Sequence, residues 1–298
     1  MRAPRLLAPP RCLWPVGATL GEGPCWSARA QALYFVDILG RRLLRCDAEG
    51  RARASWDFDE EISAVAECAD GDGLLVSLRH DLALFDPDGG ALHRLVRPEP
   101  ERPGNRFNDG KCDARGRFWA GSTDFACVAP AGALYRYDGD ACARVLDGAF
   151  ISNGPAWSRD GRTLFFNETG RACTYAFAFE PDTGELGERR LWRQWNEAEE
   201  GAPDGMTVDA DGRLWIAHWG GNAVGCYDAD SGATLARFEL PASNVTSCCF
   251  GGAELSTLFV TTARVGLDEA QRQAQPLAGA LFALQLDVQG LPANRFAG

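Results

Sequence analysis

The chain has 298 residues, a formal net charge of −11 and 46% hydrophobic residues, so it has ample material for a globular core. The acidic balance excludes a nucleic-acid partner and an anionic membrane surface, because both are bound by displacing counterions with basic residues. Acidic sites for cations remain compatible with this composition.

The first ten residues carry positive charge, but their apolar run is short and interrupted by prolines, which is not typical of a signal peptide. No later run reaches the roughly 18 apolar residues of a membrane helix. The 11 cysteines include no C-x-x-C pair, which argues against a zinc ribbon or a thioredoxin-type motif. We therefore expect a reduced protein of the cytoplasm.

A strand is predicted near residues 12–16, and a hairpin pattern then repeats along the chain. A polar residue beside Gly or Pro opens each copy, a short strand follows, an Asp-Gly type turn reverses the chain, and an aromatic strand runs back. The clearest openers are Glu22, Asn108, Asn153 and Asp204. Asn108 and Asp204 stand at the same spacing before Trp119 and Trp215, which suggests a shared role.

The openers recur about every 40–50 residues, the length of a four-stranded propeller blade. Each copy has room for about four short strands, and six copies fill the chain. The sequence therefore predicts an all-β fold, a six-bladed β-propeller with four antiparallel strands per blade, as one domain over residues 1–298. The strand near 12–16 would complete the last blade and close the ring.

In a propeller the innermost strands line the central channel, so the openers of different blades should meet at one mouth. The second strand of each blade returns to that mouth, which places Asp37, Asp124, Glu168 and His218 near its rim. Three longer segments, 97–107, 192–203 and 264–278, are expected over the mouth as lid or specificity segments.

Two carboxylates and two amides around one axis would suit a hard divalent cation such as calcium, magnesium or manganese. The three histidines are not at metal-ligand spacing. A cation with open positions suits hydrolysis of an ester or lactone, in which Asp204 would accept the proton of the attacking water. Arg106 would donate hydrogen bonds to sugar hydroxyls or to the new carboxylate. No G-x-S-x-G elbow is present, which disfavours a serine nucleophile.

Several conspicuous residues have simpler structural explanations. We interpret the acidic run at 197–200 as a solvated loop, and the adjacent Cys248 and Cys249 as packing residues. Tryptophans in the hairpins are interpreted as packing between blades; they are Trp26, Trp119, Trp157 and Trp215. Acidic residues of the hairpin turns are interpreted as structural; they are Asp70, Asp72, Asp113, Asp160, Asp209 and Asp211.

Four motifs resemble, in order and spacing, signature segments of the gluconolactonase/regucalcin (senescence marker protein) family of six-bladed propellers. They are Leu20-Gly21-Glu22-Gly23-Pro24, Arg106-Phe107-Asn108-Asp109-Gly110-Lys111, Ser152-Asn153-Gly154-Pro155 and Pro203-Asp204-Gly205. The resemblance extends over nearly the whole chain. Asn244-Val245-Thr246 and Thr261-Thr262-Ala263-Arg264 make the chain more similar to bacterial sugar lactonases than to animal regucalcins.

This resemblance implies that Glu22, Asn153 and Asp204 bind one divalent ion, which could be calcium, manganese, magnesium, zinc or iron(II). It also implies that Arg106 and Asn108 bind substrate, and that a sugar lactone is hydrolysed to its aldonic acid in oxidative pentose or hexose catabolism. The animal members have a substrate-facing Glu after the segment equivalent to Trp119-Ala120-Gly121. Here the nearby acid is Asp124, which becomes a candidate substrate contact.

Three other functions are compatible with the same sequence. A non-catalytic calcium-binding propeller would have the same ligand set as a lactonase. An interaction scaffold would bind no metal and would tolerate Asn153→Ala. A hydrolase of organophosphate or aryl esters would prefer those substrates to sugar lactones. The sequence gives no indication of oligomeric state.

Overall fold

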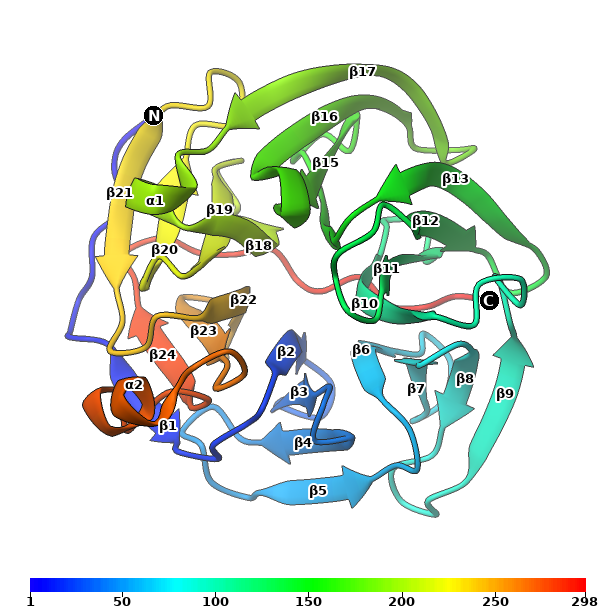
Figure 1. Ribbon diagram of the computed structural model, residues 1–298, viewed down its shortest axis with the longest axis horizontal. Coiled ribbons are helices and arrows are strands. Elements are labelled where there is room, and N and C mark those ends of the chain that lie inside the picture. Colours follow the sequence, from blue (N-terminus) through cyan, green and yellow to red (C-terminus); the bar gives the residue numbers. More distant parts are fainter.

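The computed structural model describes residues 1–298, as six four-stranded antiparallel sheets around a central axis (Figure 1). The predicted six-bladed β-propeller is confirmed. Each blade begins with the strand next to the axis, and successive strands lie further out. The second strand of every blade therefore ends at the mouth where the first strand began.

The first three blades follow one another along the chain, each with its four strands in sequence order. Blade 1 consists of β2 (Gly21–Ser27), β3 (Ala32–Asp37), β4 (Arg42–Cys46) and β5 (Ala54–Asp57). Blade 2 consists of β6 (Ile62–Glu67), β7 (Leu74–Leu78), β8 (Leu82–Phe85) and β9 (Leu92–Val96). Blade 3 consists of β10 (Asn105–Cys112), β11 (Phe118–Asp124), β12 (Gly132–Tyr137) and β13 (Cys142–Ala149).

The remaining blades complete the ring, and the sixth takes its outermost strand from the start of the chain. Blade 4 consists of β14 (Ser152–Trp157), β15 (Thr163–Glu168), β16 (Cys173–Glu180) and β17 (Glu185–Gln194). Blade 5 consists of β18 (Ala202–Val208), β19 (Leu214–Trp219), β20 (Ala223–Tyr227) and β21 (Thr234–Glu239). Blade 6 consists of β22 (Val245–Gly251), β23 (Thr257–Thr262), β24 (Leu281–Gln285) and β1 (Arg11–Trp14). β1 pairs with β24 and joins the two ends of the chain in one sheet.

Helical structure is confined to the connections. η1 (Thr169–Arg171) and α1 (Glu197–Glu200) lie before the inner strand of blade 5 in the sequence, and α2 (Glu269–Ala274) joins β23 to β24. The acidic run at 197–200 is thus one helical turn, and its prediction as a loop was wrong. Neither α-helix has the length and apolar character needed to cross a bilayer.

The core lies between neighbouring blades, where aromatic rings from the inner hairpins meet. Trp26 of blade 1 stacks on Phe259 of blade 6 with ring centroids 5.6 Å apart. Trp119 of blade 3 meets Trp157 of blade 4 at 6.0 Å, and Trp215 of blade 5 meets Phe250 of blade 6 at 5.5 Å. The predicted role of these tryptophans in packing between blades is confirmed. Cys248 and Cys249 are also buried, in two different core clusters, because adjacent strand residues face opposite sides.

A recurrent polar cluster, which we call the hairpin lock, fixes the first turn of two blades. In blade 3, one oxygen of the buried Asp113 accepts hydrogen bonds from Arg117 Nε at 2.7 Å and Trp119 Nε1 at 2.9 Å. Its other oxygen caps backbone N–H groups of the turn. The lock of blade 5 consists of Asp209, Arg213 and Trp215. These hairpin-turn aspartates are structural, as predicted.

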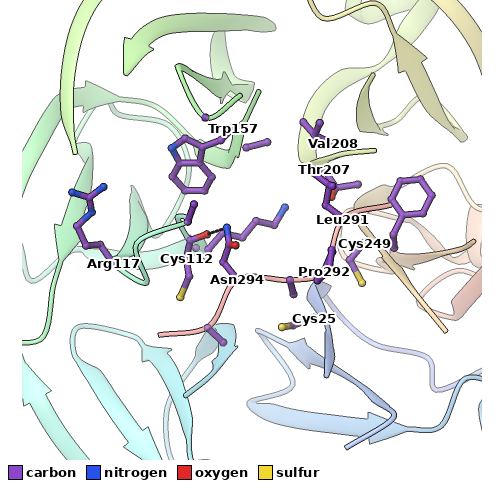
Figure 2. A pocket seen from close by; sticks show the side chains of 18 of the residues that line it. Cys25, Cys112, Arg117, Trp157, Thr207, Val208, Cys249, Leu291, Pro292 and Asn294 are labelled. Atoms are coloured by element: carbon purple, nitrogen blue, oxygen red, sulfur yellow. Dashed lines mark hydrogen bonds between the residues drawn. The ribbon is translucent and has the colours of Figure 1, made fainter. Parts of the chain in front are cut away.

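The C-terminal residues cross the ring on the hairpin side, opposite the predicted mouth (Figure 1). Gly290 bridges to Asp209 of blade 5, and Phe296 bridges to Cys68 beside blade 2. Between these anchors, residues 291–294 and the inner strands line a cavity of about 330 Å³. Figure 2 shows this cavity, where Asn294 Nδ2 donates a hydrogen bond to the carbonyl of Cys112 at 3.2 Å. The C-terminal tail therefore covers this end of the channel.

Candidate active site

All six innermost strands carry a β-bulge near the mouth, and the candidate residues lie at these bulges. Glu22 and Asn153 are the last paired residues before the irregularity, whereas Asn108 and Asp204 are unpaired within it. Asn108 and Asp204, which share a spacing in the sequence, thus share one position of the bulge, and Glu22 and Asn153 share the other. A bulge turns side chains that strict alternation would send to opposite faces, and this lets residues from both positions face the channel.

Side chains of blades 3 and 4 are directly bonded at the mouth. Arg106 Nη1 donates to Asn108 Oδ1 at 2.7 Å, and Asn108 Nδ2 donates to Asn153 Oδ1 at 2.8 Å. All three residues are at most 6% exposed. The guanidinium of Arg106 thus fixes which end of the Asn108 amide faces the next blade. Arg106, Asn108 and Asn153 form one connected polar unit.

Two carboxylates, Glu22 and Asp204, complete the site from blades 1 and 5 and are 3% and 4% exposed. Burial raises the pKa of Glu22 to about 8, with a further rise from the nearby charge of Asp109. Burial likewise raises the pKa of Asp204 well above its usual value, and the charges of Glu22 and Asp109 add to it. Arg106 opposes both shifts. We call Glu22 and Asp204 the mouth pair, because the charge of Glu22 raises the pKa of Asp204 across the mouth.

Few hydrogen-bond donors reach the carboxylate oxygens of the mouth pair, so these oxygens can still bind a ligand. Glu22 Oε2 accepts one hydrogen bond, from the backbone N–H of Gly23 at 3.1 Å. Asp204 Oδ1 is fully buried and has no hydrogen-bond partner. Buried anionic oxygens without partners are costly, and a bound cation would satisfy them. These carboxylates and the Asn153 amide oxygen therefore fit a hard divalent ion, although no cluster of three or more His, Cys, Asp or Glu side chains is arranged as a metal site.

A third acid, Asp109, is close to the mouth pair but is bonded differently. Its two oxygens accept the backbone N–H groups of Gly110 at 2.7 Å and of Gly154 at 3.0 Å. Asp109 therefore connects the bulges of blades 3 and 4. Lys111 offsets part of its charge, and the lysine ammonium donates to the carbonyl of Met206.

Hydrogen bonds from blade 4 hold the backbone and the amide of the site. Asn153 Nδ2 donates to Thr169 Oγ1 at 2.8 Å, and Thr169 Oγ1 donates to the carbonyl of Pro203 at 2.6 Å. Because its amide nitrogen is bonded outward, Asn153 directs its oxygen towards the channel. Asn167 Nδ2 donates to the backbone carbonyl of Asp204 at 2.5 Å, and Thr174 Oγ1 donates to Asn167 Oδ1 at 2.5 Å.

The acids predicted near the rim accept hydrogen bonds from backbone N–H groups. Asp37 accepts hydrogen bonds from the backbone of residues 19, 20 and 40, and it pairs with Arg42 at 2.8 Å. Asp124, the candidate substrate contact, accepts the backbone N–H of Val128 at 3.1 Å. Glu168 accepts the backbone N–H groups of Phe150 and Ile151. At least one oxygen of each carboxylate is thus bonded to the backbone of a connecting segment.

His218, also predicted near the rim, is fully buried. Its Nε2 is 2.7 Å from the hydroxyl of Tyr227, and its ring packs against Trp195. Burial, together with the charge of Arg237, lowers the pKa of His218 to about 3. A neutral imidazole in this surrounding serves packing between strands.

Each of the three long segments predicted as lids is held by internal contacts or contains a helix. Within 97–107, Glu99 is buried and accepts hydrogen bonds from Ser122 at 3.0 Å and Tyr135 at 2.9 Å, which fixes the segment to blade 3. Segment 192–203 contains α1 and the buried Trp195. Segment 264–278 contains α2, whose N-terminus has a capping box formed by Asp268 and Gln271.

Comparison with known proteins agrees with this fold. A family described as "SMP-30/Gluconolactonase/LRE-like region" matches residues 20–264. The chain is 37% identical to L-arabinolactonase of Azospirillum brasilense, covering 94% of this chain and 93% of the relative. It is 33% identical to regucalcin of Xenopus laevis, covering 94% and 95%. The solved structure of a calcium-binding regucalcin from Agrobacterium tumefaciens superimposes with a TM-score of 0.92 at 30% identity, covering 97% of both chains.

Proposed function

We propose that this chain, which belongs to the SMP-30/gluconolactonase/LRE-like family, hydrolyses a sugar lactone to the corresponding aldonic acid with the help of one divalent ion. Relatives named as lactonases support the reaction class. The observation that carries the proposal is the mouth pair, two buried carboxylates of which Asp204 Oδ1 has no hydrogen-bond partner, beside the Arg106 and Asn108 unit. We place the reaction in oxidative pentose or hexose catabolism.

Each side chain has a role that follows from its position. Glu22, Asn153 and Asp204 would hold the ion through their oxygens. When bound, the ion would supply a Lewis acid that polarises the lactone carbonyl and lowers the pKa of a bound water. Asp204 would accept the proton of the attacking water, because Oδ1 has no other partner. Arg106 and Asn108 would orient the sugar hydroxyls, and Asp124 would contribute through the carboxylate oxygen that does not cap its turn.

The cellular setting of this reaction follows from the thiols. All 11 cysteines are free, and seven of them are buried. Free thiols in this number persist in a reducing compartment. We therefore place the enzyme in the cytoplasm.

A turnover screen tests the proposal. Metal-free protein is combined with calcium, manganese, magnesium, zinc or iron(II), and acid release is followed for a panel of aldonolactones, aryl esters and organophosphates. We expect turnover of at least one sugar lactone, loss of that turnover on chelation, and loss with Asp204→Ala. A rate unaffected by chelation and by this substitution would refute the mechanism.

The relatives named regucalcin favour a second function, a non-catalytic calcium-binding propeller. Native mass spectrometry distinguishes the two functions when combined with the same screen. Stoichiometric calcium binding without acid release from any lactone would support the binding protein. Absence of any bound ion, with Asn153→Ala behaving as wild type, would indicate an interaction scaffold.

A further inference from the structure

Arg79 is an arginine at the mouth with unused donors. It follows β7 of blade 2 directly, at the end of the strand that returns to the mouth. Its side chain makes no hydrogen bond within the protein, and its Nε is fully buried without an acceptor. Its nearest carboxylate oxygen, Glu61 Oε2, is 3.7 Å from Nη1. Buried N–H donors nearly always have partners, so the Nε of Arg79 indicates a missing acceptor, while the side chain as a whole is 35% exposed.

Neighbouring arginines of blade 2 are satisfied within the protein. Arg97 forms two hydrogen bonds to Asp81, from Nε at 2.7 Å and from Nη2 at 3.0 Å. Arg94 bonds both Asp81 and Glu60. These charges balance one another on the outer part of the rim. Arg79, by contrast, has only the ion pair with Glu61 at 3.7 Å and no side-chain hydrogen bond.

The environment of Arg79 leaves net positive charge on this sector of the mouth. Glu61 is 4% exposed and lies 3.5 Å from Arg41 as well as 3.7 Å from Arg79. One carboxylate thus faces two guanidinium groups. The ring of Phe125 supports Arg79 from one side, with its centroid 4.8 Å from the guanidinium carbon. Stacking of this kind uses the face of the guanidinium and leaves its N–H edge free.

Arg79 is connected to the candidate active site through the backbone. Its carbonyl accepts the N–H of Phe107 at 3.0 Å, and Phe107 lies between Arg106 and Asn108 in the chain. Arg106 also has a buried Nε without an acceptor. Two guanidinium groups with spare donors therefore occupy the blade 2 and blade 3 side of the mouth, next to the residues assigned to sugar hydroxyls.

We propose that Arg79 and Arg106 form an anion subsite for a carboxylate of the substrate, remote from its lactone carbonyl. This inference rests on the proposed lactonase function and names its substrate class, the monolactones of sugar diacids. A guanidinium edge matches the two oxygens of a carboxylate in a bidentate arrangement. The overall charge of −11 would repel such a substrate, so a local cationic subsite is needed to bind it.

The test uses two lactones that differ at one carbon. Glucaro-1,4-lactone has a carboxylate where glucono-1,4-lactone has a hydroxymethyl group. We expect wild type to favour glucaro-1,4-lactone at least about tenfold in kcat/KM, and Arg79→Gln to remove that preference through KM. Turnover of glucono-1,4-lactone should change less than about threefold, since its remote hydroxymethyl group carries no charge. Arg144→Gln is the matched control, because Arg144 is an exposed arginine whose removal changes the net charge equally.

Calorimetric titration with glucarate and gluconate separates this inference from the lactonase function. If neither lactone is hydrolysed but wild type binds glucarate more tightly than gluconate, and Arg79→Gln does not, the lactonase proposal fails and the anion subsite stands. If both lactones are hydrolysed equally by wild type and by Arg79→Gln, with equal binding of both acids, the subsite is refuted and the lactonase stands. Stronger selection for 6-phosphoglucono-1,5-lactone than for the diacid lactone would overturn the assignment to a carboxylate.

Discussion

Buried carboxylates occur in two regions of this propeller, and the two regions treat them in opposite ways. In the hairpin locks, Asp113 and Asp209 are at most 1% exposed and each bonds an arginine, a tryptophan and the turn backbone. At the mouth, Glu22 and Asp204 are nearly as buried, but each carboxylate is close to others and one Asp204 oxygen has no partner. The same chemical group is stabilised in one region and left unsatisfied in the other.

This difference separates structural from functional acids better than burial does. A carboxylate with matched donors contributes to folding, and removing it leaves a buried charge behind. A carboxylate held against other negative charges costs stability, and that cost persists where binding or catalysis needs it. Substitutions in the two regions should therefore have opposite effects on stability and activity.

The largest effect is expected for the mouth pair. Asp204→Asn keeps the shape of the side chain but removes the proton acceptor and one charged ligand, so kcat should fall roughly 1,000-fold. The same change relieves repulsion with Glu22, and the free energy of unfolding of the metal-free protein should rise by about 1 kcal/mol. Steady-state kinetics and urea unfolding measure both quantities. Retained turnover, or a clear loss of stability, would contradict this account of the mouth.

The hairpin lock should show the reverse behaviour. Asp209→Ala leaves the buried Arg213 with only the exposed Asp211 and leaves Trp215 Nε1 without an acceptor, so we expect a loss of about 3–5 kcal/mol in the free energy of unfolding. Activity per folded molecule should remain near wild type, because the lock lies at the opposite end of the inner strand. Asp113→Ala is the matched substitution in blade 3. A kcat that falls while stability is unchanged would assign Asp209 to the site instead.

A smaller effect is expected for Thr169, which supports the site by accepting a hydrogen bond from Asn153. Thr169→Val removes the acceptor of Asn153 Nδ2, so the amide is no longer held with its oxygen towards the channel. Affinity for the divalent ion should fall about 10–100-fold. Thr169→Ser keeps the hydroxyl and should restore it. Calorimetric titration with manganese measures this directly, and equal affinities for the valine and serine variants would argue against orientation by Thr169.

The sequence predicts those features of the two regions that depend on residues close together in the chain. The repeat of turns and aromatic strands predicts the propeller, the tryptophan packing and the structural role of Asp209, because the lock forms within one hairpin. The openers Glu22, Asn108, Asn153 and Asp204 are also visible in the repeat. The bulge that shifts two of them by one position is a register effect, which spacing along the chain does not reveal.

Contacts between blades were missed for a physical reason. Asp109 bonds the backbone of Gly154, and Asn167 bonds the backbone of Asp204, each across a blade boundary. Such partners are far apart in the chain, and single polar residues on strands resemble ordinary surface positions. The signal that could have indicated Asp109 and Lys111 is their place beside Asn108 within one motif. Arg79 has no comparable signal, because only the structure shows that its donors lack acceptors.

The smallest effect is expected at the edge of the lock in blade 5, where Arg213 pairs with an exposed and with a buried aspartate. Asp211 pairs with Arg213 at 2.6 Å, yet its side chain is 62% exposed, whereas that of Asp209 is fully buried. Solvent screens the exposed pair, and Arg213 keeps its bonds to Asp209, so Asp211→Ala should cost less than about 1 kcal/mol. Urea unfolding of Asp211→Ala beside Asp209→Ala measures the contrast. Similar losses in the two variants would mean that the turn, and not the buried carboxylate, stabilises this hairpin. The number of donors bonded to each carboxylate would then not explain the difference between the hairpin locks and the mouth.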